Sequence, residues 1–255
     1  MKLYSLLNTF IIITILTFIS FCGKKQVPVS LDSSALLVVD MQVGRNPGAV
    51  FSSDEKIPEP GEIPLPEEWK KAGLTAEDVI DAIKHERNVA FPNSLKVIEY
   101  FKKINRPVIY LRWGSFVDDA LDMEPNVRKE SILLMGEDTS KWDVEIIQVD
   151  PRLLKVAKGI EVVKTGHDAF TSSNINYVLK NLNIKNVFMI GGHTNACYLA
   201  TAQSAKKNGY NIISIHDATT DAFETKRMSG IEKAEFDLIL SSEELISEKN
   251  DYLKK

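Results

Sequence analysis

Short apolar runs separated by segments with helical spacing are the feature that most limits how this chain can fold. The runs do not alternate apolar with polar residues, so each is expected to be a strand covered on both faces. They are Ala35–Val39, Pro107–Leu111, Ile160–Val163, Val187–Ile190, Ile212–Ile215 and Leu238–Leu240. Helical patterns follow at Asn93–Ile104, Ser173–Leu182, Ala196–Lys207 and near Glu243–Lys249. This order predicts a three-layer α/β domain whose six-stranded sheet is mostly parallel.

Composition narrows the class further. The chain has 255 residues, of which 44% are hydrophobic and 26% are charged, as expected for one large folded domain or two small ones. Its formal net charge of -4 gives no basic surface for nucleic acid, which is not an expected partner. The two cysteines, Cys22 and Cys197, lie in regions of different character, so no internal disulfide is expected.

Residues 1–21 are predicted to be a signal peptide or membrane anchor, because Lys2 is followed by an uncharged, mostly apolar run to Phe21. The segment ending in Cys22 resembles the lipobox of bacterial lipoproteins, although that pattern has a small residue where Phe21 stands. Lipidation of Cys22 is the leading interpretation, with an uncleaved anchor helix or ordinary secretion as alternatives. The domain is therefore expected to be exported and membrane-anchored, with residues 22–34 as a tether.

Residues 35–255 are predicted to form the folded domain, with an insertion at 41–88. Glycine and proline are frequent in this insertion, which favours extended chain over long regular structure. Thr75 and Asp78 predict the start of a helix that runs to Arg87, with His85 as a surface residue of that helix. The insertion is a candidate lid or subunit contact.

Three polar residues stand where strands or a helix meet the expected ligand-binding edge of the sheet. Asp40 and Lys164 each end an apolar run, and parallel strands end at the same edge. Cys197 lies in the first turn of a helix, where the helix dipole favours a thiolate. Each has an ordinary alternative: a capping aspartate, a surface lysine and a small buried cysteine. The turn at Gly191–Gly192 could direct backbone amides toward an oxyanion.

The segments LLVVDMQ (Leu36–Gln42), KTGHDAF (Lys164–Phe170) and GGHTNACYLATA (Gly191–Ala202), with Asp217–Ala218 after the next strand, resemble the isochorismatase-like cysteine hydrolases. The resemblance implies a Rossmann-like sheet of six strands. It also implies a triad in which Asp40 is the general base, Lys164 supplies positive charge and Cys197 is the nucleophile.

The resemblance also implies where the oxyanion is held and which bond is cleaved. Backbone amides of Cys197 and His193 would hold the oxyanion, the latter reached through a non-proline cis peptide between Gly192 and His193. The implied reaction is hydrolysis of a carbon–nitrogen bond in a small amide or carbamoyl compound, through a thioester that water cleaves after activation by Asp40. Relatives commonly form dimers or tetramers, so a homo-oligomer is expected.

Further residues are predicted to contact the substrate: Gln42, Arg112, Trp113 and Phe170. Members of the nicotinamidase type place histidines after their second strand to bind a metal, whereas Leu111–Ser115 contains none, so neither a metal nor another cofactor is expected. The side chains of His167, His193 and His216 are not assigned catalytic roles.

Two other functions remain open at this stage. One is hydrolysis of an isochorismate-like enol ether, with Asp40 as acid; the siderophore-pathway enzymes that do this generally lack the cysteine. The other is a catalytically silent exported lipoprotein built on the same scaffold.

Overall fold

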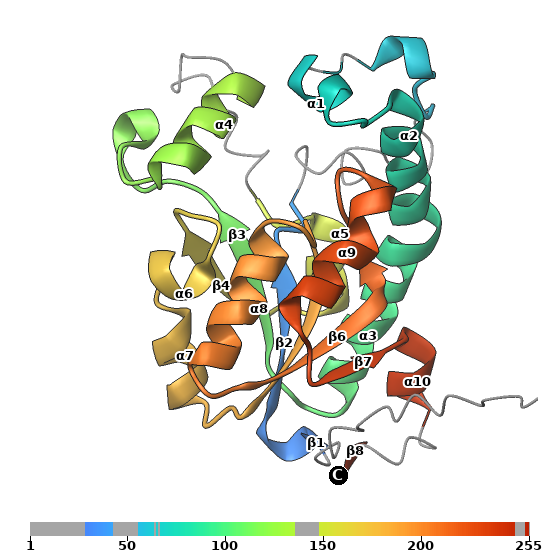
Figure 1. Ribbon diagram of the computed structural model, residues 1–255. Coiled ribbons are helices and arrows are strands. Elements are labelled where there is room, and N and C mark those ends of the chain that lie inside the picture. The colour runs from blue at the N-terminus through green and yellow to red at the C-terminus, as the bar shows by residue number, and fades with distance from the viewer. Residues whose placement is uncertain are drawn as a thin grey trace, which may run out of the picture.

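The computed structural model describes residues 29–42, 56–63, 65, 67–135, 148–247 and 253–254. A six-stranded sheet with the order β4-β3-β2-β5-β6-β7 forms its centre, and every adjacent pair is parallel (Figure 1). The strands are β2 (Ser34–Val39), β3 (Val108–Trp113), β4 (Ile160–Lys164), β5 (Asn186–Gly191), β6 (Asn211–Thr219) and β7 (Leu238–Leu240). The predicted α/β fold and all six predicted strands are confirmed.

Helices cover both faces of the sheet and complete the three layers. One face carries α3 (Phe91–Lys103), α5 (Pro151–Val156) and α10 (Ser242–Ile246); the other carries α6 (Ala169–Ser172), α7 (Ile175–Asn181), α8 (Cys197–Lys207) and α9 (Glu224–Ala234) (Figure 1). Successive strand residues point to opposite faces. Leu36 and Val38 therefore pack in the core that contains α3, whereas Leu37 and Val39 pack in the core that contains α8.

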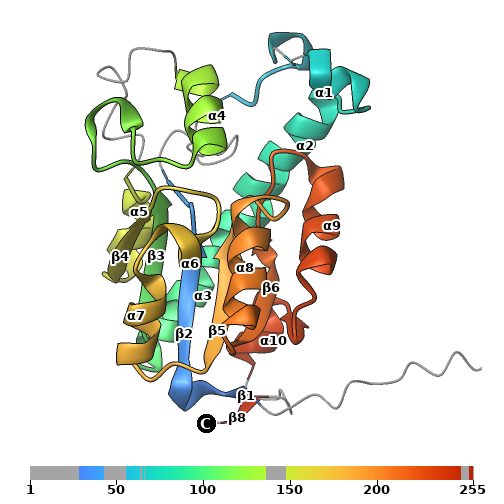
Figure 2. The same cartoon turned by 60° about the vertical axis from the view of Figure 1, so that its left-hand side comes forward.

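The order of the strands reverses between β2 and β5, because the chain adds β3 and β4 on one side and β6 and β7 on the other. Open α/β sheets bind ligands at such a point, outside the carboxyl ends of the strands. Helices α1 (Glu67–Lys71) and α4 (Pro125–Met135) lie above this edge (Figure 2). A short 3-10 helix precedes each of them in the chain, Pro60–Glu62 before α1 and Asp118–Ala120 before α4. The fold therefore places the expected crevice between β2 and β5.

The described fold begins before the predicted boundary at Ala35. Strand β1 (Val29–Ser30) pairs with β8 (Leu253–Lys254), and the 3-10 helix Leu31–Ser33 leads into β2. Val29 and Leu31 are buried in the first core, and Arg106 donates to the backbone and carboxylate of Asp32. The last residues assigned to the tether thus belong to the domain, because the side chains of Val29 and Leu31 are buried in its core.

The predicted signal or anchor segment and Cys22 lie outside the described residues. Within the described ranges, no helix combines the length and hydrophobicity needed to cross a bilayer.

The helix predicted from Thr75 is present as α2 (Ala76–His85), and the Thr75 hydroxyl accepts from the amide of Asp78 at 3.2 Å. The predicted end of the insertion at Asn88 stays a prediction, and Asn88 lies inside a continuous helical stretch. Helix α2 continues through a π-helical turn (Glu86–Ala90) into α3 as one helical column. Pro92 has no N–H and its ring crowds the preceding turn, and a π turn is a common way to accommodate such a residue.

Candidate active site

Lys164 brings the three predicted catalytic residues together. Its Nζ lies 2.9 Å from Oδ2 of Asp40 and 3.2 Å from Sγ of Cys197. A third contact runs from the same ammonium to the carbonyl oxygen of Gly166 at 3.0 Å. Lys164 is completely buried, Asp40 is 5% exposed and Cys197 is half-buried. The ends of β2 and β4 and the first residue of α8 therefore meet at one point.

The electrostatics of this cluster differ from the expectation for the cysteine. Burial and the negative charge of Asp40 raise the pKa of Cys197 to about 12, although Lys164 acts in the opposite direction. Burial beside a carboxylate therefore opposes the thiolate that the helix position favours, whereas Lys164 supports it. The pKa of Lys164 is raised, because attraction to Asp40 and Cys197 outweighs the effect of its burial, so it remains a cation.

A tight turn follows β5 and leads to the cysteine. Gly191 has a φ of 95°, and the peptide bond between Gly192 and His193 is cis, as the resemblance implied. A β-carbon on Gly192 would lie 2.6 Å from the carbonyl oxygen of Thr220. Among the described residues, neither the amide of His193 nor that of Cys197 donates to a backbone acceptor. The oxyanion site predicted at these two amides stays a prediction.

The chain after β6 holds this turn in place. Oδ2 of Asp221 accepts from the hydroxyl of Thr194 at 2.9 Å and from the amide of Asn195 at 2.8 Å. The amide of Thr194 also donates to the carbonyl oxygen of Thr220. Asp221 was not predicted as a site residue, although a carboxylate just after a buried strand is the kind of signal that singled out Asp40.

Gln42 bridges β2 to the end of β3. Its side-chain amide donates to the carbonyl oxygen of Trp113 at 3.2 Å and accepts from the amide of Trp113 at 2.9 Å. Because Gln42 is almost fully buried, these bonds fix the edge of the site. Trp113 is opposite Lys164 in the ladder and packs on Ala120, Met123 and Val127. Substrate contacts by Gln42 and Trp113 stay predictions.

Arg112 and Phe170 each have a neighbour other than the cysteine, on β4 and before β6 respectively. Arg112 shares its face of β3 with Tyr110, which packs in the core opposite α8, and its Nε lies 3.4 Å from Oε2 of Glu161. The ring of Phe170 packs against Tyr210, with centroids 5.8 Å apart. Substrate contacts by Arg112 and Phe170 stay predictions.

His167 is a functional candidate that sequence reasoning set aside. Its Nδ1 lies 3.4 Å from Sγ of Cys197, and its amide donates to Oε2 of Glu124 at 3.3 Å. Its position three residues after Lys164 could have indicated a role at the site. A residue in a loop, however, gave no reason to expect its ring to face the thiol. His85, expected at the surface, is half-buried with Nε2 3.2 Å from the carbonyl oxygen of Thr219.

Tyr198 fixes the start of α8 beneath the cysteine. It is fully buried, and its hydroxyl donates to the carbonyl oxygen of Met189 at 3.0 Å and lies 2.8 Å from the hydroxyl of Ser214. The first turn of α8 is thereby attached to β5 and β6, which determines where Cys197 stands.

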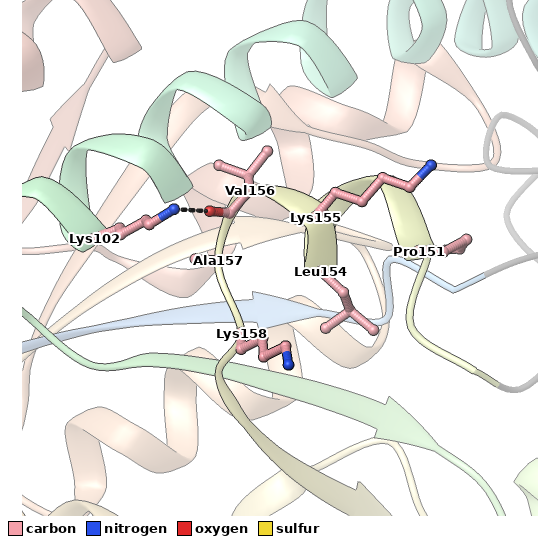
Figure 3. A pocket seen from close by; sticks show the side chains of 7 residues that line it. All are labelled: Lys102, Pro151, Leu154, Lys155, Val156, Ala157 and Lys158. Carbon is pink, nitrogen blue, oxygen red and sulfur yellow. Dashed lines mark hydrogen bonds between the residues drawn. The ribbon is translucent and has the colours of Figure 1, made fainter.

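A surface pocket elsewhere on the molecule does not coincide with this cluster. It lies between the carboxyl ends of α3 and α5, where Lys102 donates to the carbonyl oxygen of Val156 at 2.7 Å (Figure 3). None of its lining residues approaches Cys197. Within the described part of the chain, no group of three or more His, Cys, Asp or Glu side chains is arranged to hold a metal, and a metal-free site remains a prediction.

The six-stranded parallel sheet with helices on both faces is the fold of the isochorismatase-like class. Residues 76–244 match the isochorismatase domain, and the chain belongs to the isochorismatase family, whose members are hydrolases. No curated protein sequence matches the chain significantly.

Solved structures show the same fold. N-carbamoylsarcosine amidase from Thermoplasma acidophilum is 21% identical, with a TM-score of 0.54 over 82% of this chain and 96% of that one. A cysteine hydrolase from Pseudomonas syringae pv. phaseolicola 1448A is 18% identical, with a TM-score of 0.58 over 88% of this chain and 96% of that one. An isochorismatase family protein from Desulfovibrio vulgaris is 16% identical, with a TM-score of 0.57 over 82% and 94%.

Proposed function

We propose that this protein is a cysteine hydrolase that cleaves a carbon–nitrogen bond in a small amide or carbamoyl compound through a thioester on Cys197. The observation that carries the proposal is the placement of the Lys164 ammonium 2.9 Å from Asp40 and 3.2 Å from Cys197. A nucleophile with a base and an orienting cation within hydrogen-bond reach is the arrangement that covalent catalysis requires.

In the first step Asp40 takes the thiol proton as sulfur attacks the substrate carbonyl. Asp40 interacts with the thiol strongly enough to raise its pKa, so it is the base placed to receive the proton. Lys164 remains charged and stabilises the thiolate as it forms, because one of its N–H groups already points at sulfur. The raised pKa of Cys197 means that the nucleophile is generated during the reaction and is not stored beforehand.

Attack at the carbonyl produces an oxyanion, which the amides of His193 and Cys197 are proposed to receive. Donors fixed before the reaction are effective because they need no reorganisation as charge develops. The two hydrogen bonds that Asp221 accepts from Thr194 and Asn195 support this assignment, because they hold the turn that carries the His193 amide. Loss of ammonia or an amine leaves the thioester, which water cleaves.

The substrate class is proposed from two observations. The site has one half-buried cysteine within reach of a carboxylate and an ammonium, which suits acyl transfer. The similar amidase from Thermoplasma acidophilum is named for a carbamoyl compound. Small amides, ureides and N-carbamoyl amino acids are therefore the compounds to test first.

Ammonia release from a panel of these compounds tests the proposal. Wild type should turn over at least one of them, Cys197→Ala should lose the activity, and Cys22→Ala should keep it because Cys22 lies outside the described domain. An enol ether of the isochorismate type, followed by pyruvate release, covers the alternative reaction. Turnover of the enol ether alone, or amide turnover that survives Cys197→Ala, would refute the proposal.

A further inference from the structure

The imidazole of His167 contacts the reacting sulfur, but the mechanism built on Asp40, Lys164 and Cys197 assigns no role to this imidazole. Its Nδ1 lies 3.4 Å from Sγ, about as close as the Lys164 ammonium at 3.2 Å. The cysteine therefore has an imidazole as well as a carboxylate and an ammonium around it, and an imidazole beside a nucleophile is the commonest acid–base group in enzymes.

The backbone around His167 is fixed on both sides, so the contact with sulfur is built into the loop between β4 and α6. On one side, the carbonyl oxygen of Gly166 accepts from Lys164 at 3.0 Å, and the amide of His167 donates to Glu124 at 3.3 Å. On the other, Asp168 caps α6 by accepting from Phe170, and it also accepts from the hydroxyl of Ser204 at 2.6 Å.

The proton balance of the reaction leaves a place for a second acid–base group. Lys164 has three N–H donors, directed at Asp40, Cys197 and Gly166, and it stays a cation, so it supplies no proton. If Asp40 keeps the thiol proton until the thioester has formed, it has no capacity to take one from water. Lys164 holds Oδ2 of Asp40 at 2.9 Å throughout.

We propose that His167 is a catalytic residue that protonates the leaving nitrogen and then activates the water. This inference rests on the proposed function, and it assigns to His167 the water activation that the family resemblance gives to Asp40. The carbon–nitrogen bond breaks as the imidazolium gives its proton to nitrogen, leaving a neutral imidazole. That imidazole takes a proton from water as oxygen attacks the thioester carbon. The carbon–sulfur bond breaks, and Asp40 returns its proton to sulfur.

Several charged or titratable groups surround His167. Asp40, Lys164 and Cys197 face it from β2, β4 and α8, Glu124 binds its amide from the segment before α4, and His193 interacts with it from the turn after β5. The imidazolium must be present at the start of the cycle. The kcat–pH profile for an amide should therefore have an alkaline limb that depends on His167.

The test compares two substrates with the same acyl group: the best amide from the panel and its 4-nitrophenyl ester. An amine leaves only after protonation, whereas 4-nitrophenolate leaves without it. His167→Gln should lower amide turnover about 10²-fold or more. It should keep the ester's burst of nitrophenolate, followed by slow turnover because water is no longer activated. The alkaline limb of the amide profile should also disappear.

Matched variants separate this inference from a folding defect and from the proposed function. His216→Gln, on β6 and away from sulfur, should keep wild-type rates, and added imidazole should partly restore amide turnover in His167→Ala. Equal losses for amide and ester burst, or no loss in His167→Gln while Cys197→Ala is inactive, would overturn the role of His167 alone. Turnover that persists in Cys197→Ala overturns the proposed function instead.

Discussion

Lys164 is a fully buried cation whose environment explains both the stability and the reactivity of the residues around it. A buried charge is tolerated only when it is paired and hydrogen-bonded, and here Asp40, Cys197 and Gly166 receive its N–H groups. Asp40 and Lys164 have opposite effects on the thiol: the carboxylate raises the pKa of Cys197 and the ammonium lowers it. Single substitutions at these two positions should therefore change the cysteine in opposite directions.

Alkylation of Cys197 by iodoacetamide is expected to be slow near neutral pH and to rise about tenfold per pH unit towards a pKa of about 12, because only the thiolate reacts. Asp40→Asn should accelerate labelling at a given pH, since removing the carboxylate lowers the pKa of the thiol. Lys164→Met should slow it. Labelling rates from mass spectrometry between pH 6 and 10 measure this, and rapid labelling of wild type below neutral pH would contradict it.

Lys164→Met should also lower the free energy of unfolding by about 3–5 kcal/mol, because it leaves the Asp40 carboxylate buried without its cation. The double variant Asp40→Asn/Lys164→Met should recover part of this loss, since neither charge then remains. Urea denaturation of the two single variants and the double variant measures the coupling. A double variant that loses as much as the sum of the single variants would show that the two charges do not stabilise each other.

Among the elements, the turn between β5 and α8 does most to position the chemistry. It begins at Gly191 with a positive φ, passes close to Thr220 at Gly192 and is held by Asp221. Tyr198 then attaches the first turn of α8 to β5 and β6. The nucleophile and both candidate oxyanion donors therefore belong to one segment that is anchored at each end.

Gly192→Ala should lower kcat about 10²–10³-fold, the cost of losing one fixed oxyanion donor, because the added methyl group meets the carbonyl of Thr220 and displaces the His193 amide. Gly61→Ala is the matched control, since a β-carbon there meets nothing within 4 Å. Steady-state kinetics on the best amide gives the comparison. An unchanged kcat in Gly192→Ala would show that the turn does not position an oxyanion donor.

At the scale of the whole molecule, the chain combines a hydrolase domain with an N-terminal segment that we propose exports and anchors it. The described domain begins at β1, which pairs with β8, and this pair lies at the end of the fold opposite the carboxyl edge of the sheet (Figure 1). A tether attached there would leave the carboxyl edge of the sheet facing away from the membrane.

Cys22→Ser should therefore move the protein from the detergent phase to the aqueous phase in Triton X-114 partitioning and abolish labelling with a radioactive fatty acid. Both follow if Cys22 carries the lipid. Amide turnover by the same variant should match wild type, which shows that the domain is intact. Unchanged partitioning with no lipid label would favour the uncleaved anchor helix instead.

The sequence predicted the sheet and the central cluster well, because both depend on local patterns. Apolar runs specify buried strands, and the parallel arrangement then brings Asp40 and Lys164 to one edge. It could not predict the raised pKa of Cys197, which depends on burial and on the distance to a carboxylate 157 positions away in sequence. Nor could it predict which way Arg112, Phe170 and His167 point, since strand alternation and loop anchoring decide that in three dimensions.

Rapid-quench mass spectrometry of the protein during amide turnover tests the central claim most directly. The account predicts an acyl adduct on the peptide that contains Cys197, removable by hydroxylamine as a thioester should be, and no adduct or turnover in Cys197→Ala. Turnover without any adduct on Cys197, together with full activity in Cys197→Ala, would contradict it.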